Sequence, residues 1–321
     1  MLAVVVISGW LWLGFIGLVL FFLTLDLGVF HRHAHVVRFK EAFVWTLVWF
    51  SLALLFALAL KPARGQTESL EFLTGYLIEL SLSMDNVFVM ALIFAFFKVP
   101  AQFQHRVLFW GILGALLMRG LMIGAGVALI DWLHWVLYLF GVLLVYSGIK
   151  MMFVATEVHP ENNRVIRLAR RFYPVSPDFD GQKFTTTWNG RSALTPLALV
   201  LLMIETTDLV FALDSIPAIF AVTTKPFIVF TSNVFAILGL RSLYFVLAGA
   251  IAYFRYLKYG LSLVLVFVGV KMLLDPHDRL PRWIQLEIPI GLSLLFVAAI
   301  ILTSILLSVL AARQEKRGRV S

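Results

Sequence analysis

Long apolar runs alternate with short polar connections along the whole chain. Each run is close to the roughly 20 residues that an α-helix needs to cross the hydrocarbon core of a bilayer. The runs are continuously apolar and do not alternate, so they predict transmembrane helices and argue against a β-barrel. The chain is therefore predicted to be an all-α polytopic membrane protein, a single transmembrane domain over residues 1–321. The nine predicted spans are approximately 3–25, 41–60, 70–96, 107–130, 135–153, 194–222, 228–252, 258–274 and 286–311.

Composition supports this fold class and excludes several functions. The chain is 61% hydrophobic and 14% charged, whereas about 25% of the residues of a soluble domain are charged. It contains no cysteine, which excludes disulfides, thiolate metal sites and thiol redox chemistry. The first apolar run has no basic segment before it and no cleavage motif after it, so we expect a retained helix and not a signal peptide.

The positive charge has a pattern that fixes a predicted orientation. A net charge of +8 would suggest nucleic acid as the partner of a soluble protein. Here 17 of the 26 lysines and arginines fall in one alternating set of loops, and five fall in the other set. Cytoplasmic loops carry the excess of basic residues in membrane proteins. The N-terminus is therefore predicted outside, the C-terminus in the cytoplasm, and no nucleic-acid partner is expected.

Two stretches of the chain resemble each other feature by feature. Each has two acidic residues six positions apart, then an arginine within an apolar run, then a glycine-x-lysine-methionine ending. In chain order the matches are Glu79 and Asp85 with Asp208 and Asp214, Arg119 with Arg241, and YSGIKMM (146–152) with FVGVKML (267–273).

These matches predict an internal repeat. The first copy covers residues 70–153 and the second covers 194–274, with a cytoplasmic loop at 154–193 between them. Each copy has three spans, an odd number, so the two copies must cross the membrane in opposite directions. Inverted repeats of this kind are typical of secondary transporters, which bind their substrate near the midplane between the repeats.

The cytoplasmic loop contains two predicted elements. Arg164–Phe172 (RVIRLARRF) is a candidate basic amphipathic helix lying on anionic lipid; the alternative is a plain connector whose charge only sets orientation. Phe184–Thr195, with Asn189-Gly190 at its middle, predicts a β-hairpin.

The predicted spans contain acidic residues that membranes rarely tolerate. A charge at mid-bilayer costs several kcal/mol, so the default interpretation of such a group is functional. Carboxylate and amide oxygens suit the hard divalent ions Mg²⁺, Ca²⁺ and Mn²⁺, and argue against Zn²⁺ or Cu⁺. The candidate metal-binding residues are Glu79, Asp85, Asn86, Glu205, Asp208 and Asp214.

Four further residues are predicted to support this site. Arg119 and Arg241 are expected to be counter-charges, and Asn233 offers a buried amide oxygen. Pro217 cannot donate a hydrogen bond to the carbonyl of Leu213, which favours local unwinding beside the acids. Acids six positions apart point about 120° away from each other on an ideal helix, so either the helices unwind or the acids line a wide polar interior. The alternative is that the acids only pair with arginines and lysines to hold the bundle together.

Charge balance favours exchange of metal for protons. Five acids and two arginines leave an excess of three negative charges within the predicted spans. Without metal, some of these carboxylates must be protonated, because burial and mutual repulsion favour the neutral form. A divalent ion would then expel protons when it binds.

At these residues the chain resembles a known family. The segments ELSLSMDNVFV, IETTDLVFALDSIPAIFAVT and TSNVFAILGLRSLYF are similar to signatures of the TerC family of bacterial integral membrane proteins, close to its Alx branch, and the resemblance runs from about Phe39 to Met272. It implies an inverted-repeat, inner-membrane protein of the wider lysine-exporter-like group, linked to manganese export and tellurium resistance. It also implies that the six candidate ligands belong to the family's two acidic motifs.

The residues and the resemblance together predict a transporter and not an enzyme. We expect export of a divalent cation, above all Mn²⁺, from the cytoplasm in exchange for protons, with no bound cofactor. Its expected partners are the cation and the lipid bilayer. A Ca²⁺/H⁺ exchanger and a non-transporting scaffold in a metal or tellurite stress-response complex remain alternatives.

Overall fold

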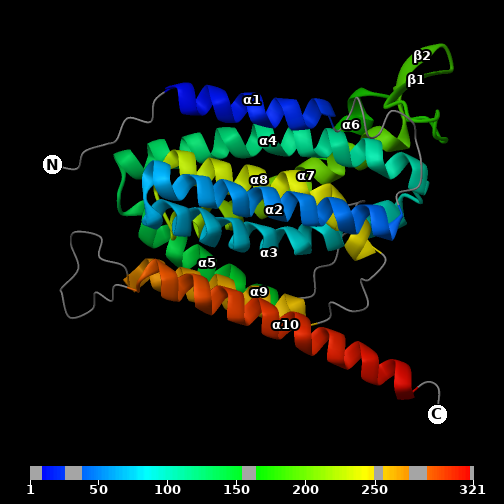
Figure 1. Ribbon diagram of the computed structural model, residues 1–321. Coiled ribbons are helices and arrows are strands. Elements are labelled where there is room, and N and C mark those ends of the chain that lie inside the picture. The colour runs from blue at the N-terminus through cyan, green and yellow to red at the C-terminus, as the bar shows by residue number, and fades with distance from the viewer. Residues whose placement is uncertain (1–8, 26–37, 154–163, 249–255, 275–287, 319–321) are drawn as a thin grey trace.

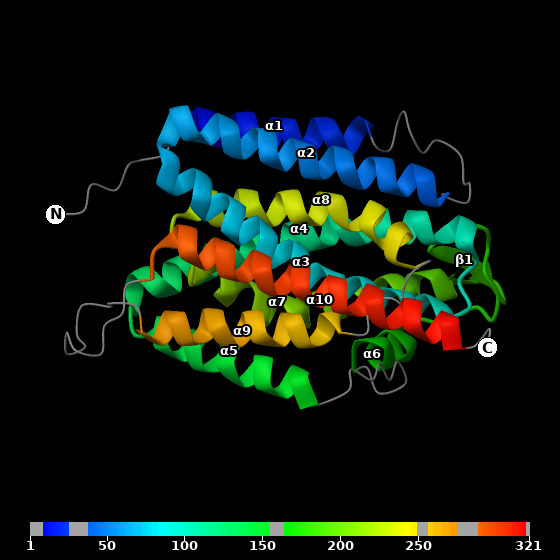
Figure 2. The ribbon, with the colours of Figure 1, turned by 60° about the horizontal axis from the view of Figure 1, so that its bottom comes forward.

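The structure, a computed structural model, describes residues 9–25, 38–153, 164–248, 256–274 and 288–318. Within these ranges nine long helices cross the molecule in alternating directions (Figures 1 and 2). A short helix and a two-stranded sheet lie between the fifth and the sixth of these long helices in the chain. In chain order the elements are α1 (Gly9–Leu25), α2 (Phe39–Arg64), α3 (Gln66–Phe96), α4 (Ala101–Trp132), α5 (Val136–Phe153), α6 (Arg164–Phe172), β1 (Thr185–Trp188), β2 (Arg191–Leu194), α7 (Pro196–Phe220), α8 (Pro226–Ala248), α9 (Leu257–Leu274) and α10 (Ile290–Gly318).

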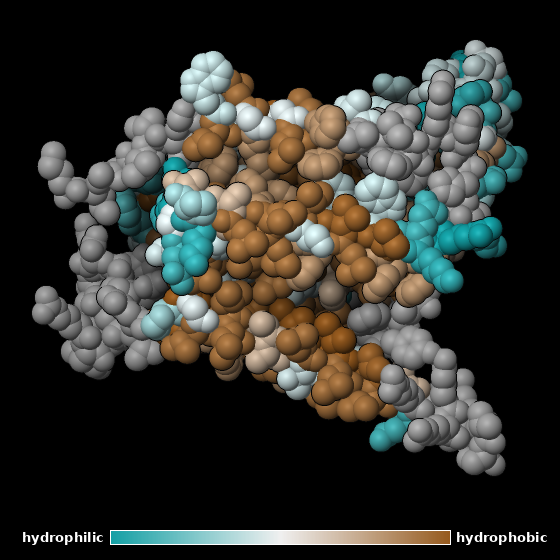
Figure 3. Space-filling view, viewed as in Figure 1, coloured by the Kyte–Doolittle hydropathy of each residue, from teal (hydrophilic) through white to brown (hydrophobic). Residues whose placement is uncertain are grey.

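This architecture confirms the all-α polytopic fold class. Eight of the described helices are long and apolar enough to cross a membrane, and α1 is a shorter apolar helix. Figure 3 shows hydrophobic side chains across the middle of one face, with hydrophilic ones gathered at its two ends. A belt of this kind matches a bilayer flanked by water on both sides.

Local sequence explains where several elements begin and end. Proline occupies the first position of both α7 and α8, where its missing N–H costs nothing. Gly65 separates α2 from α3 with a φ of 96°, a backbone conformation that favours glycine. The predicted hairpin is confirmed: β1 and β2 pair antiparallel, and Asn189 and Gly190 both have positive φ, as a two-residue turn of type I′ requires. The predicted helix at Arg164–Phe172 is α6.

Helix α8 occupies the centre of the bundle, with nearly all of its side chains buried. It packs against α2, α3 and α4, while α4 and α3 also pack against α7. Helices α5 and α9 form the closest pair. A Cβ atom at Gly269 would lie 2.8 Å from the carbonyl oxygen of Gly141, and one at Gly148 would lie 2.8 Å from the carbonyl oxygen of Ser262. Small residues let transmembrane helices approach this closely.

The packing has a feature that two related units would produce. Helix α3 packs against α8, its predicted counterpart α7 packs against α4, and the counterparts α5 and α9 pack against each other. The inverted repeat itself stays a prediction.

Helix α7 corrects one expectation. It remains α-helical from Pro196 through Phe220, so Pro217 does not unwind it. Helix α3 is likewise continuous around Glu79 and Asp85. Some predictions lie outside the described residues. These are parts of three spans (3–8, 249–252, 286–287), part of the cytoplasmic loop (154–163), and the basic residues Arg32, Arg255, Arg279, Arg282 and Arg319.

Candidate functional site

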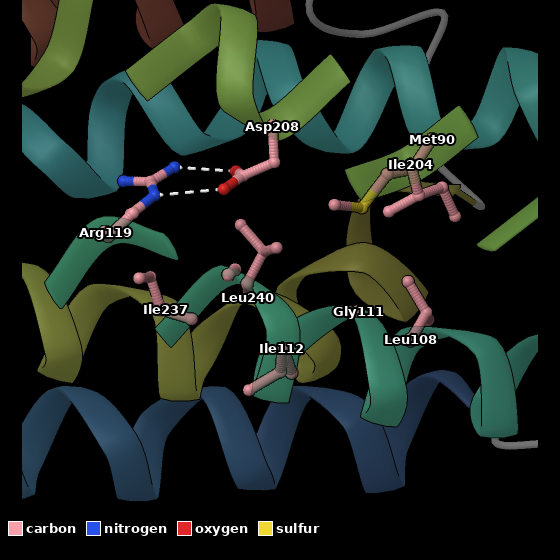
Figure 4. Close-up of a pocket in the computed structure, with 10 residues that line it drawn as sticks. Met90, Leu108, Gly111, Ile112, Arg119, Ile204, Asp208, Ile237 and Leu240 are labelled. Atoms are coloured by element: carbon pink, nitrogen blue, oxygen red, sulfur yellow. Dashed lines mark hydrogen bonds and ion pairs between the residues drawn. The ribbon is translucent and has the colours of Figure 1, made fainter. Parts of the chain in front are cut away.

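Arg119 of α4 is the centre of a buried polar cluster. Its side chain is 2% exposed. Its Nη2 donates to Oδ1 of Asp208 at 2.7 Å and its Nε donates to Oδ2 at 3.1 Å, a two-pronged ion pair with α7 (Figure 4). Paired geometry of this kind gives both strength and a fixed orientation.

The same guanidinium reaches a second carboxylate. Nη1 of Arg119 forms an ion pair with Glu79 of α3, which is fully buried, and it lies 3.4 Å from the hydroxyl of Ser215 on α7. Asn86 of α3 donates from Nδ2 to Oδ1 of Asp208 at 3.3 Å. One arginine therefore joins α3, α4 and α7, and it brings together Glu79 and Asp208, the matched acids of the two predicted repeats. This is the position that the counter-charge interpretation of Arg119 requires.

Several buried oxygens around these helices have no hydrogen-bond partner among the described residues. Burying such an atom unpaired costs free energy, so each is a place where a proton, a water molecule or a cation would be stabilised. They include oxygens on α3 at Ser83 and Asn86, a second carboxylate oxygen of Glu79, a carboxylate oxygen of Glu205, and the amide oxygen of Asn233. Glu79, Ser83 and Asn86 recur at helical spacing and so share one face of α3.

Glu205 lies one turn before Asp208 on α7 and also faces α4. A Cβ atom at Gly114 of α4 would collide with the Glu205 carboxylate, so only glycine leaves room for it. This pairing was not predictable from the sequence, because a glycine in an apolar helix most often reflects helix packing alone.

Asp85 and Asp214 lie apart from the Arg119 cluster. Both are half-buried. Asp214 accepts a hydrogen bond from Ser147 of α5 at 2.7 Å and lies within electrostatic reach of Lys150. Asp85 lies within electrostatic reach of Lys258 at the start of α9.

The direction of the helices places these two acids on opposite sides of Arg119. Helices α3 and α7 run in opposite directions (Figures 1 and 2), and Glu79 and Asp208 meet at one guanidinium. Six residues of α-helix rise about 9 Å. Asp85 therefore lies about 9 Å from the Arg119 level toward one end of the bundle, and Asp214 lies about 9 Å toward the other end.

The six predicted ligands thus do not converge on one point. Among the described residues no three acidic or histidine side chains are grouped closely enough to hold one metal ion. Arg119 pairs with Glu79 and Asp208, and Asn86 donates a hydrogen bond to Asp208. Glu205 lies one turn before Asp208 on α7, and Asp85 and Asp214 lie on opposite sides of this cluster. Arg241 and Asn233 are both buried in α8. The ligand roles of these residues stay predictions.

A small cavity of about 10 Å³ adjoins the Arg119–Asp208 pair. That volume holds about one water molecule. Figure 4 shows the ion pair at one end of the lining and apolar side chains from α3, α4, α7 and α8 along the rest, among them Met90, Leu108 and Ile237. The cluster is therefore closed to bulk water in this conformation.

A second ionic network ties the α2–α3 turn to the α7–α8 loop. Lys225 contacts Glu71 at 3.1 Å and Glu68 at 3.3 Å, and Thr223 donates to Glu71 at 2.9 Å. Sequence reasoning missed this network, since acids near a helix start are usually solvated. These contacts link the first turns of α3 to the segment that follows α7, at one end of the bundle.

Comparisons with known proteins agree with this architecture. The profile of the family described as "Integral membrane protein TerC family" matches residues 64–316. The chain is 55% identical over 283 residues to an uncharacterized membrane protein of Myxococcus xanthus, covering 88% of this chain and 89% of that protein. It is 41% identical over 289 residues to an uncharacterized membrane protein of Rickettsia bellii, covering 90% and 96%.

A third relative carries a functional name. The chain is 45% identical over 292 residues to a protein of Escherichia coli named "Putative membrane-bound redox modulator Alx", covering 88% of this chain and 91% of that protein. No solved structure matches the chain. The profile match and these relatives, spanning most of a bundle of membrane helices with buried acids, establish that the chain belongs to the integral membrane protein TerC family.

Proposed function

We propose that this protein is a membrane transporter that exports a divalent metal cation from the cytoplasm in exchange for protons. The observation that carries the proposal is the buried cluster in which the single positive charge of Arg119 is shared by two carboxylates, Glu79 and Asp208, in the middle of the helical bundle. Further carboxylates stand beside and on both sides of it. Ionisable groups inside a membrane are costly, and a chain that keeps this many has a use for them.

The arrangement suggests stations along a path. Asp85 and Asp214, about 9 Å to either side of the Arg119 level, would receive the cation from opposite sides of the membrane. In this interpretation Arg119 is a tethered cation that occupies the central carboxylates while no substrate is present. A divalent ion passing the centre would compete with the guanidinium for Glu79 and Asp208.

The donor chemistry indicates the class of ion. The candidate ligands are carboxylate, amide and hydroxyl oxygens, which suit Mn²⁺, Mg²⁺ and Ca²⁺. We favour Mn²⁺ within this class because the family resemblance points to manganese. Proton exchange follows from charge, since the acids outnumber the nearby arginines and a metal must displace protons from them. The inner membrane as location, and an N-terminus outside with a cytoplasmic C-terminus, are part of the proposal.

A flux assay tests the proposal. The purified protein is placed in proteoliposomes, and uptake of Mn²⁺, Ca²⁺ and Mg²⁺ is measured side by side with an Asp214→Asn variant as the matched control. We expect Mn²⁺ uptake well above that of the variant and of protein-free vesicles. Faster Ca²⁺ than Mn²⁺ movement would favour a calcium/proton exchanger. No flux of any of the three ions would favour the non-transporting scaffold.

The name of the Escherichia coli relative suggests redox modulation as a second function. This chain has no cysteine, so it has no thiol with which to exchange electrons or disulfides. We therefore propose that any redox effect is indirect, through the concentration of a metal ion in the cell.

A further inference from the structure

Helix α6 has an exposed surface that the transport proposal does not use. One side of the helix is fixed to the protein: Ile166 is 4% exposed and belongs to the apolar core that includes the first turns of α7. On another side Leu168 and Phe172, one turn apart, are 55% and 70% exposed. Tyr173, which follows the helix, is 57% exposed. Two large apolar side chains on a nine-residue helix, and a third directly after it, are therefore exposed.

Arginines border this apolar strip. Arg167, Arg170 and Arg171 are exposed, and the helix contains no acidic residue. At about 100° per residue, the three arginines lie on one flank of the helix, between the direction of Ile166 and that of Leu168. The helix thus has three sectors: one buried against α7, one apolar and exposed, and one basic and exposed.

The place of α6 in the fold suggests what covers the strip. It packs on α7, and Ile166 shares an apolar core with Leu197 and Val200 in the first turns of that helix, so α6 lies at the end of the bundle where α7 begins. Figure 2 shows α6 beside the bundle at this end. Basic residues of neighbouring elements lie at the same end, including Lys98 and Arg106. A short helix with large apolar side chains beside arginines, held at the edge of a membrane belt, fits the boundary between lipid headgroups and acyl chains.

We propose that α6 is an interfacial helix that inserts Leu168 and Phe172 into the bilayer surrounding the protein and binds anionic lipid headgroups through Arg167, Arg170 and Arg171. Each basic residue close to an anionic leaflet contributes roughly a fivefold gain in partitioning. The three arginines together should change the ratio of inserted to free α6 on the order of 100-fold. The inference holds whether or not the protein moves metal.

Because the chain has no cysteine, single cysteines can be introduced into the full-length protein and spin-labelled. Leu168→Cys and Phe172→Cys report on α6. Thr187→Cys, exposed in the hairpin, is the water reference, and Leu117→Cys, 65% exposed on α4, is the lipid reference. Each protein is placed in nanodiscs of phosphatidylcholine with or without phosphatidylglycerol. The accessibility of the label to oxygen, which enters lipid, is compared with its accessibility to a water-soluble nickel chelate.

With phosphatidylglycerol present, labels at 168 and 172 should resemble the label at 117, rich in oxygen contact and shielded from nickel. In the combined variant Arg167→Gln/Arg170→Gln/Arg171→Gln, the accessibilities of both labels should shift toward those of the label at 187. The variant in which the same three arginines are replaced by lysine should behave like the parent. Nickel access equal to that at 187 would overturn the proposal. Shielding from both reagents would also overturn it, because it indicates a protein contact. So would insertion that is unchanged when the arginines are replaced by glutamine or when phosphatidylglycerol is left out.

Discussion

The two pairs of repeat-matched acids have different surroundings, although they occupy corresponding positions of the sequence. Glu79 and Asp208 are buried and share one arginine. Asp85 and Asp214, each six residues further along, are half-buried and lie outside that cluster. A buried acid with a fixed counter-charge contributes to the fold, whereas a half-buried acid can exchange its partner. The comparison teaches that two acids at matched positions have different surroundings, with the inner pair held by a buried ion pair and the outer pair in the surroundings that the proposed cation path requires.

The two outer acids also differ from each other. Asp214 accepts a hydrogen bond from Ser147. In the matched segments YSGIKMM and FVGVKML, the position corresponding to Ser147 is Val268, which has no hydrogen-bonding group in its side chain. The two predicted repeats therefore differ at the position of Ser147, whose side chain donates a hydrogen bond to Asp214.

Removing the shared arginine should have the largest effect. Arg119→Gln leaves two carboxylates buried without a full counter-charge, and breaking a buried ion pair costs roughly 3–5 kcal/mol. We expect a large loss of thermal stability in detergent, measured as the melting temperature. Arg191→Gln in the exposed hairpin is the matched control, with a change within about 0.5 kcal/mol.

A neutral replacement of the whole cluster sharpens this test. In Arg119→Met/Glu79→Gln/Asp208→Asn none of the three residues of the ion-pair cluster is charged, and replacing a buried ion pair by uncharged residues is often neutral or stabilising. The triple variant should therefore melt above Arg119→Gln and yet fail to transport. If Arg119→Gln and Arg191→Gln have the same melting temperature, the central cluster does not stabilise the fold.

The second-largest expected effect is a loss of transport without a loss of stability, in variants of the two outer acids. Asp85→Asn and Asp214→Asn should each abolish export of manganese while the protein still reaches the membrane, because in the proposed function the lost carboxylate binds the cation and is not part of the buried ion pair. Asp208→Asn should by contrast lower stability as well, by about 1.5–3 kcal/mol for a lost hydrogen bond to a charged group. Growth of cells in excess manganese and melting of the purified variants separate the two outcomes. Protection equal to the parent's by either outer variant would remove that residue from the path.

The smallest expected effect concerns the difference between the outer acids. Ser147→Val makes α5 resemble α9 at this position and removes one hydrogen bond, worth about 0.5–1.5 kcal/mol net. We expect a several-fold change in the apparent affinity for the ion with little change in folding. Ser304→Ala, which removes only a bond to the backbone of its own helix, is the control. An unchanged affinity in Ser147→Val would mean that Ser147 does not tune Asp214.

Sequence periodicity predicted most of the fold, because a membrane allows few backbone solutions. In the part of the chain that the structure describes, the nine long helices, the hairpin at Asn189-Gly190 and helix α6 lie where polar and apolar patterns place them. The continuity of α7 through Pro217 was not predictable, since a proline lowers the stability of a helix but its neighbours decide whether the helix unwinds.

The site was predictable as a set of residue types and not as a geometry. Intramembrane acids and arginines are visible in any sequence, because their cost makes them conspicuous. Which acids share an arginine depends on helix rotation and direction, and only the packed structure brings Glu79 to Asp208 and leaves Asp85 and Asp214 on opposite sides. Ser147, Ser215 and Gly114 give no signal of their own, since serine and glycine are common in packed membrane helices.

The central claim, exchange of a divalent cation for protons, is tested most directly in proteoliposomes that contain a pH-sensitive dye, with no imposed voltage. Addition of Mn²⁺ should produce metal uptake with a simultaneous counter-flow of protons, and collapse of an imposed pH gradient should slow uphill transport. Both signals should be absent in Asp214→Asn vesicles. Metal flux without any change of internal pH, unaffected by a protonophore, would contradict the exchange and leave a facilitated, channel-like path in its place.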